Sequence, residues 1–166
     1  MASKRDFTPE EWIKVLQSPM LVGIAVSTAD PGGLWGTLKE AAASSSELAS
    51  SKLGAGSNEL IKAVITDIET PEGRSALQKA LRSCFADAEP AQCVERSLAN
   101  LQEVSAIVDA KAPADAIAFK TWLHGISQKV AEAATEGAFL GFGGVQVSDA
   151  EKATLADITK ALGTTA

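Results

Sequence analysis

The stretch Met20-Leu-Val-Gly-Ile-Ala-Val26 is the longest apolar run in the sequence, and polar residues from Ser27 onward end it. Every side of a helix with this sequence is apolar, which is typical of a helix buried in the middle of a bundle. A helix that crosses a membrane needs roughly 20 apolar residues. The run therefore predicts a buried core helix that extends to about Ala29, and no membrane span.

Helical periodicity and helix-start signals recur along the chain, and no run of alternating β-branched residues indicates a strand. Thr8-Pro9-Glu10-Glu11 predicts the start of the first helix. Pro19 predicts a kink or break near Gln17 and Ser18, between this helix and the central one. Residues 1–7 are expected to be a flexible tail. Further helices are expected over about 34–53 and after Ser57, Thr70-Pro71, Glu89-Pro90, Ala112-Pro113 and Ser148. The helix after Glu89-Pro90 is expected to bury one apolar stripe: Val94, Leu98, Leu101, Val104 and Val108.

These segments predict an all-α protein, a compact multi-helix bundle of about seven to eight helices around the central apolar helix. No segment resembles an interdomain linker, so we expect one domain over residues 1–166. A Ser148–Glu151 capping box and a closing Gly163 bound the last helix. The helix after Pro113 carries apolar residues at steps of three and four, close to a heptad pattern: Ala116, Phe119, Leu123, Ile126, Val130 and Ala133.

Composition excludes several classes of function. The 15 basic and 21 acidic residues leave a net charge of −6, which argues against nucleic-acid binding because phosphate contacts need clustered lysines and arginines. One histidine and two cysteines nearly exclude a Cys/His zinc site within one chain, because a structural zinc site takes four such ligands. A chain of this length buries enough surface to fold without a cofactor. No apolar stretch follows Lys4 and Arg5, so we predict no secretory signal and expect a cytoplasmic protein.

The stretch from Phe142 to Gly163 is similar to the closing segment of the tellurite-resistance TerB-like proteins: a small turn, then a capped helix that ends in Ala-Leu-Gly. Val26-Ser-Thr-Ala-Asp30 resembles the early acidic turn of that family. The resemblance implies divalent-metal binding at Asp30 and Asp149. The residues themselves also fit simpler roles, because Asp30 before Pro-Gly-Gly is ordinary helix-stop chemistry and Asp149 is a first-turn acid on a helix dipole.

Four further residues are candidates to line a pocket for an apolar molecule or pigment between helices: Trp35, Trp122, His124 and Phe142. In the alternative interpretation the tryptophans are core contacts and the histidine is a partly buried polar side chain. Cys84 and Cys93 flank a short connection. They either form a disulfide across a helical hairpin or remain two free thiols that pack as small apolar groups.

The sequence has no nucleophile elbow, Walker motif, EF-hand loop or Glu-x-x-His pattern, so we expect neither an enzyme nor a bound cofactor. The leading hypothesis is a non-catalytic protein–protein interaction or accessory module, a stress-related one included, that binds a protein partner or itself. The alternatives are a carrier of an apolar small molecule, a TerB-like metal-binding protein, and an enzyme that uses His124 beside a buried carboxylate.

Overall fold

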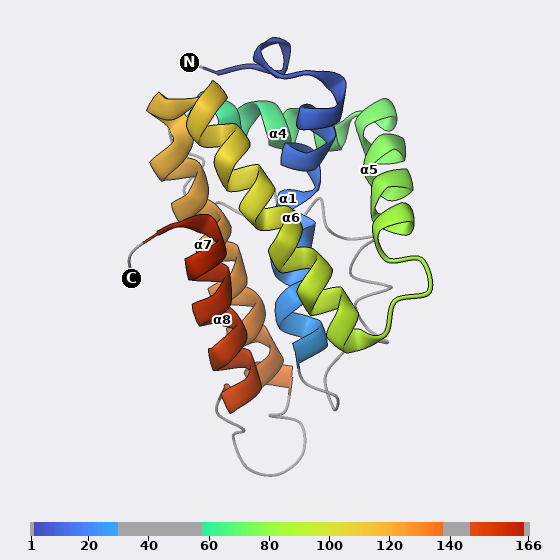
Figure 1. Ribbon diagram of the computed structural model, residues 1–166, viewed down its shortest axis with the longest axis vertical. Coiled ribbons are helices and arrows are strands. Elements are labelled where there is room, and N and C mark those ends of the chain that lie inside the picture. The colour runs from blue at the N-terminus through green and yellow to red at the C-terminus, as the bar shows by residue number, and fades with distance from the viewer. Residues whose placement is uncertain (1, 30–57, 138–146, 165–166) are drawn as a thin grey trace.

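The computed structural model describes residues 2–29, 58–137 and 147–164, and all regular structure in these ranges is helical (Figure 1). The all-α prediction is therefore confirmed. A 3-10 turn and six α-helices follow one another along the described chain: η1 (Lys4–Asp6), α1 (Pro9–Ala29), α4 (Glu59–Glu69), α5 (Pro71–Cys84), α6 (Pro90–Lys111), α7 (Pro113–Gly137) and α8 (Asp149–Leu162).

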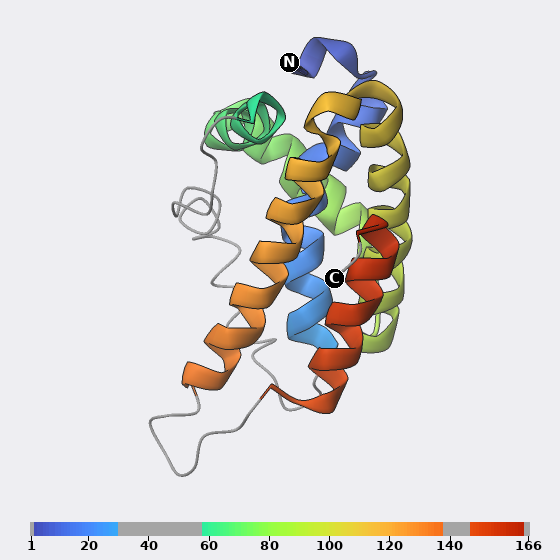
Figure 2. The same cartoon turned by 90° about the vertical axis from the view of Figure 1, so that its left-hand side faces the viewer.

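Helix α1 lies at the centre of the bundle, as the apolar run predicted. It packs against each of the other five α-helices, most extensively against α6 and α7, and Figures 1 and 2 show it enclosed between them. Leu21, Val22, Ala25 and Val26 are fully buried. A single cluster of buried apolar side chains includes residues from all six α-helices, so the described helices share one core.

The predicted break at Pro19 is wrong, because α1 continues unbroken through it. Proline has no N–H, so the carbonyl of Val15, four residues earlier, loses its usual helical partner. The hydroxyl of Ser18 donates a hydrogen bond to that same carbonyl at 2.7 Å. Ser18 and Pro19 are both buried. The neighbouring serine thus satisfies a carbonyl that water could not reach.

The count of helices is smaller than the predicted seven to eight for two reasons. The two segments on either side of Pro19 form one helix, and the segment expected over 34–53 lies outside the described residues. The other predicted starts agree closely with the structure. Ser148 forms its capping box with Glu151, Gly163 ends α8 in the left-handed conformation at φ 66°, and Asn58 rather than Ser57 caps α4.

Residues 2–7 do not form the expected flexible tail but pack against the bundle. Ala2 and Phe7 are each 7% exposed, and the Phe7 ring lies 5.6 Å from that of Trp12. The backbone N–H of Ala2 donates to the buried carboxylate of Asp115 at 2.8 Å. Two apolar side chains in a short segment proved sufficient to fold it onto the core, a contact that sequence periodicity does not reveal.

The buried face of α6 differs from the predicted stripe at its N-terminal end. Cys93 and Ser97 are buried, while Val94 and Leu98 are only half-buried. From Leu101 onward the predicted stripe is correct. The N-terminal part of α6 therefore presents small polar groups, not branched apolar ones, to its neighbours.

One helix in the described ranges, α1, is long and apolar enough to cross a membrane by length and composition. Within the fold, 61% of its most apolar window is buried. Core helices and signal sequences share these properties, and the described residues contain no second such helix, so they do not form a multi-span membrane protein.

Candidate functional site

The structure separates the two predicted pocket residues that it describes. Trp122 is 5% exposed and packs against Phe119 with ring centroids 5.6 Å apart, so it is a core contact. His124 is half-buried, and a spacing of two residues puts it on a different side of α7. Trp35 and Phe142 lie outside the described residues. Residues 122 and 124 therefore do not face each other across a shared pocket.

The predicted metal ligand Asp149 is fully exposed at the start of α8, and its carboxylate lies 3.6 Å from the ammonium group of Lys152. Asp30 lies outside the described residues. Within the described ranges, no three His, Cys, Asp or Glu side chains are grouped as metal ligands would be. Asp149 thus has the position of a first-turn acid, which favours a helix dipole.

Cys84 and Cys93 are free thiols in the structure, which is the second of the two alternatives for this pair. The thiol of Cys84 accepts a hydrogen bond from Asn100 at 3.6 Å. Asn100 is two helical turns, about 10 Å, beyond Cys93 along α6, while the thiol of Cys93 is directed toward the carbonyl of Ala88. The two thiols therefore have different hydrogen-bond partners. Burial raises the pKa of both thiols, an effect that Arg96 partly offsets, and a protonated thiol is a poor nucleophile.

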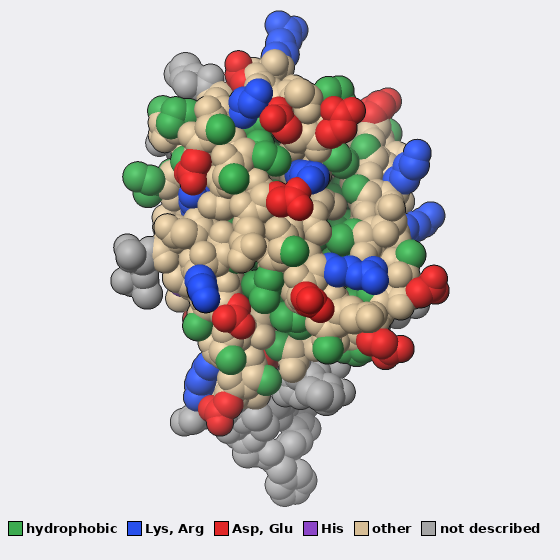
Figure 3. All heavy atoms as spheres, viewed as in Figure 1, with side chains coloured by type: hydrophobic (Ala, Val, Ile, Leu, Met, Phe, Trp, Pro, Cys, Tyr) green, Lys and Arg blue, Asp and Glu red, His purple; other side chains and the backbone are tan. Residues whose placement is uncertain are grey.

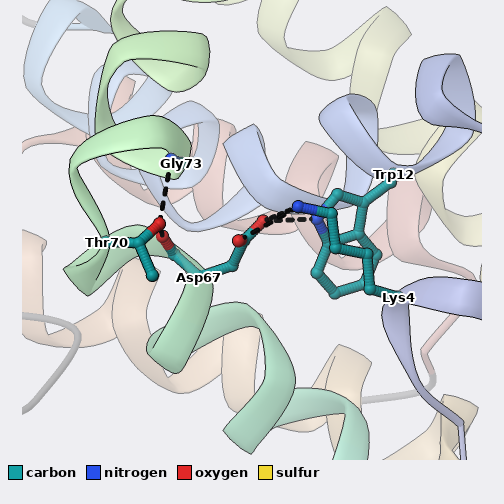
Figure 4. A network of polar contacts seen from close by, with 5 residues as sticks. All are labelled: Lys4, Trp12, Asp67, Thr70 and Gly73. Atoms are coloured by element: carbon teal, nitrogen blue, oxygen red, sulfur yellow. Dashed lines mark hydrogen bonds and ion pairs between the residues drawn. The ribbon is translucent and has the colours of Figure 1, made fainter.

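A polar network that the sequence did not predict joins η1, α1 and α4 (Figure 4). The carboxylate of Asp67 accepts hydrogen bonds from the Lys4 ammonium group at 2.9 and 3.1 Å and from the Trp12 indole N–H at 2.6 Å. We call these three residues the Asp67 clamp. The clamp closes the N-terminal segment onto the bundle. Trp12 and Lys4 lie 55 and 63 residues from Asp67 in the sequence, so no local pattern could have revealed the clamp.

A shallow, open pocket of about 420 Å³ lies beside the Asp67 clamp. Lys4 pairs with Asp67, and Lys62 pairs with Glu59 at 3.0 Å. These four charges cancel, so the pocket presents no net charge to a ligand. Its lining is mostly polar or small: Ala2, Ser3, Lys4, Glu59, Lys62, Ala63, Thr66, Asp67 and Thr70.

The outward side of α7 carries few charged residues. In the 17 residues from Ala112 to Gln128 the only fixed charges are Asp115 and Lys120, and these are 8% and 7% exposed. Lys120 is bound by Asp109 of α6 at 2.6 Å. By contrast, the molecular face seen in Figure 3 carries interspersed acidic and basic side chains. We define the α7 outer face as Ala114, Ile117, Ala118, Thr121, Gly125 and Gln128.

Ile117 is the most distinctive residue of the α7 outer face. It is 79% exposed and is the one large apolar side chain that stands so far out of the described surface. Thr121, one turn later, donates its hydroxyl hydrogen bond to the carbonyl of Ile117 at 2.9 Å. The hydroxyl of Thr121 therefore already has an acceptor within the chain. Removing water from it costs less free energy than removing water from a hydroxyl with no internal partner.

The chain matches no protein-family model, no curated protein and no solved structure. The TerB-like resemblance and the metal binding it implies stay predictions, and inferences about function depend on the surface itself.

Proposed function

We propose that this protein is a non-catalytic interaction module that binds a protein partner through the α7 outer face. The observation that supports it is the run of five helical turns, about 25 Å long, with no exposed charged side chain. A single exposed isoleucine needs no explanation on a soluble protein. An exposed helix face without charge is unusual in a chain whose residues are 22% charged.

The location of α7 supports the same proposal. The helix runs along the side of the molecule that faces the viewer in Figure 2, and Ala114, Ile117, Ala118 and Thr121 on it are exposed. Its opposite side, with Phe119, Leu123 and Ile126, is buried in the core. A rigid helix held by the core can present side chains to a partner with little loss of conformational entropy on binding.

Site-specific photo-cross-linking in an extract of the source organism tests this proposal. A photoreactive amino acid in place of Ala118 is expected to form covalent adducts with a protein, either another chain or a second copy. The same amino acid in place of Ser75, an exposed residue on α5, is the matched control and is expected to form few. Introducing Ile117→Glu should remove the Ala118 adducts. Equal labelling at both positions, or none at Ala118, would contradict the proposal.

A further inference from the structure

Building on the proposed function, we infer that the partner of the α7 outer face is a second copy of this chain, bound antiparallel about a two-fold axis at Thr121. Two-fold symmetric contacts require a surface that is complementary to itself. The α7 outer face meets this requirement in charge and in shape.

Charge favours a second copy at this surface. The chain carries a net charge of −6, so two copies repel each other over most approaches. The 17-residue span from Ala112 to Gln128 has no exposed charge of either sign. Two such surfaces can meet without bringing like charges together or burying an unpaired one.

The shape of the α7 outer face is also self-complementary. Ile117 protrudes, whereas Gly125 has no side chain and the space above it is open, since an added Cβ would meet no atom within 4 Å. Ile117 and Gly125 lie four residues before and four residues after Thr121. An antiparallel pair centred on Thr121 therefore places Ile117 of each copy opposite the partner's Gly125. Ala114 and Ala118 allow the two helices to approach closely.

The same register brings opposite charges together at the ends of the contact. The side chain of Asn58 bonds to the carbonyl of Asp115, so α4 and its second residue, Glu59, lie beside the start of α7. Lys129 is exposed and is fourteen residues, nearly four turns, beyond Asp115, so it shares that side of the helix. A two-fold axis perpendicular to α7 keeps the α4 sides of both copies together. Lys129 of each copy then lies near the partner's Glu59.

The contact area indicates a weak, reversible dimer. A helix face about 24 Å long and about 10 Å wide covers about 240 Å² of each copy. A standard stable interface buries about 800 Å² on each partner. Dimers should therefore form at high protein concentration and dissociate on dilution.

Light scattering on the full chain tests the inference directly. The molar mass should rise from monomer toward dimer as the concentration approaches about 1 mM, where even a millimolar association is half complete. Ile117→Glu and Gly125→Leu should each remove the rise, since the first puts a charge into the contact and the second fills the open space. Circular dichroism should show both variants folded. The melting temperature should be unchanged in Ile117→Glu and no lower than wild type in Gly125→Leu, since leucine favours a helix more than glycine does. A wild-type chain that stays monomeric at about 1 mM would overturn the inference.

Two further variants test the register. Thr121→Cys lies on the proposed axis and should give an intermolecular disulfide in air with a copper catalyst, whereas the wild-type chain and Ser75→Cys should not. Lys129→Glu and Glu59→Lys should each weaken the dimer, and the double variant should restore it. Cross-linking at Thr121 no faster than at Ser75, or a double variant weaker than both singles, would contradict this register.

The failure of this inference can be distinguished from the failure of the proposed function. If the chain is monomeric but the Ala118 probe captures a different protein in an Ile117-dependent way, the proposed function stands and the homodimer is wrong. If the probe captures neither a second copy nor another protein, both are wrong.

Discussion

Helices α1 and α7 have similar lengths and few exposed charges but lie in different environments. Both are long helices with few exposed charges, and both contribute to the same core cluster. Five helices surround α1, and its apolar residues are buried within the chain. Among the described residues, helix α7 is covered on one side, and Ile117 on its other side is 79% exposed. The comparison shows that α1 obtains its burial from the chain itself, whereas the outer face of α7 would obtain it from the partner that we propose.

Truncation of a buried residue of α1 should have the largest effect on stability. Leu21→Ala removes a fully buried side chain and should lower the free energy of unfolding by about 2 to 5 kcal/mol, because the cavity closes only partly. Urea denaturation followed by circular dichroism measures this loss. The matched control is Ile117→Ala, which should change stability by less than about 0.5 kcal/mol. Similar losses for both variants would mean that the two helices do not differ as described.

Substitution of two glycines should have the next largest effect on stability. Gly73 lies in a crowded position and Gly125 in an open one. A Cβ at Gly73 would lie 1.9 Å from the carbonyl oxygen of Asp67, which the Thr70 hydroxyl also contacts. Gly73→Ala should therefore destabilise the fold by about 1 to 3 kcal/mol. A Cβ at Gly125 meets nothing within 4 Å, so Gly125→Ala should stabilise α7 by up to about 1 kcal/mol. Thermal melting at low concentration compares the two, and a destabilising Gly125→Ala would show that this surface is not open.

Substitution of Ser18, whose hydroxyl bonds to the carbonyl that Pro19 leaves unpaired, should have a smaller effect on stability. Ser18→Ala leaves the carbonyl of Val15 without a donor and should cost about 1 kcal/mol. In a Pro19→Ala background the restored N–H of residue 19 can bond to that carbonyl, so Ser18→Ala should then cost almost nothing. Chemical denaturation of the four chains forms a double-mutant cycle. Equal losses in both backgrounds would mean that Ser18 does not compensate for the proline.

The smallest effect on stability, and the largest on association, should come from a charge in the α7 outer face. Ile117→Glu should leave the free energy of unfolding within about 0.5 kcal/mol of wild type, since the side chain is exposed in the single chain. The same variant should no longer form the concentration-dependent species seen by light scattering. A marked loss of stability would instead assign Ile117 a role within the fold.

Much of the fold could be predicted from local sequence because helix caps and periodicity are local properties. The Ser148 capping box, the Gly163 cap and the apolar side of α7 from Ala116 to Ile126 are in the structure as predicted, while Ala133 lies outside the residues whose side chains are described. Of the kink or break predicted at Pro19, the break does not occur, because the prediction considered the proline without the hydroxyl beside it. The pairing of Cys84 and Cys93 was left open, because closeness in sequence does not determine which turn of α6 faces Cys84.

The candidate site was predicted less well, because the exposure of a surface depends on how the other helices pack, and local sequence does not show that packing. The prediction of Trp122 and His124 as pocket residues relied on residue type. The α7 outer face relies instead on the burial of Asp115 and Lys120, the two charges that the sequence contains there. The ion pair with Asp109 of α6 explains why the ammonium group of Lys120 is buried and does not lie on the surface of α7.

The sequence by itself determined that this chain is helical, where most helices begin and end, and that its most apolar segment is the central one. These features depend on hydrogen bonds and side-chain spacing within a few residues. The tertiary structure alone decided that residues 2–7 join the core, that Asp67 clamps them there, and that no described residue covers the Ile117 side of α7. Each of these depends on residues dozens of positions apart, which are brought together only when the whole chain buries its apolar surface.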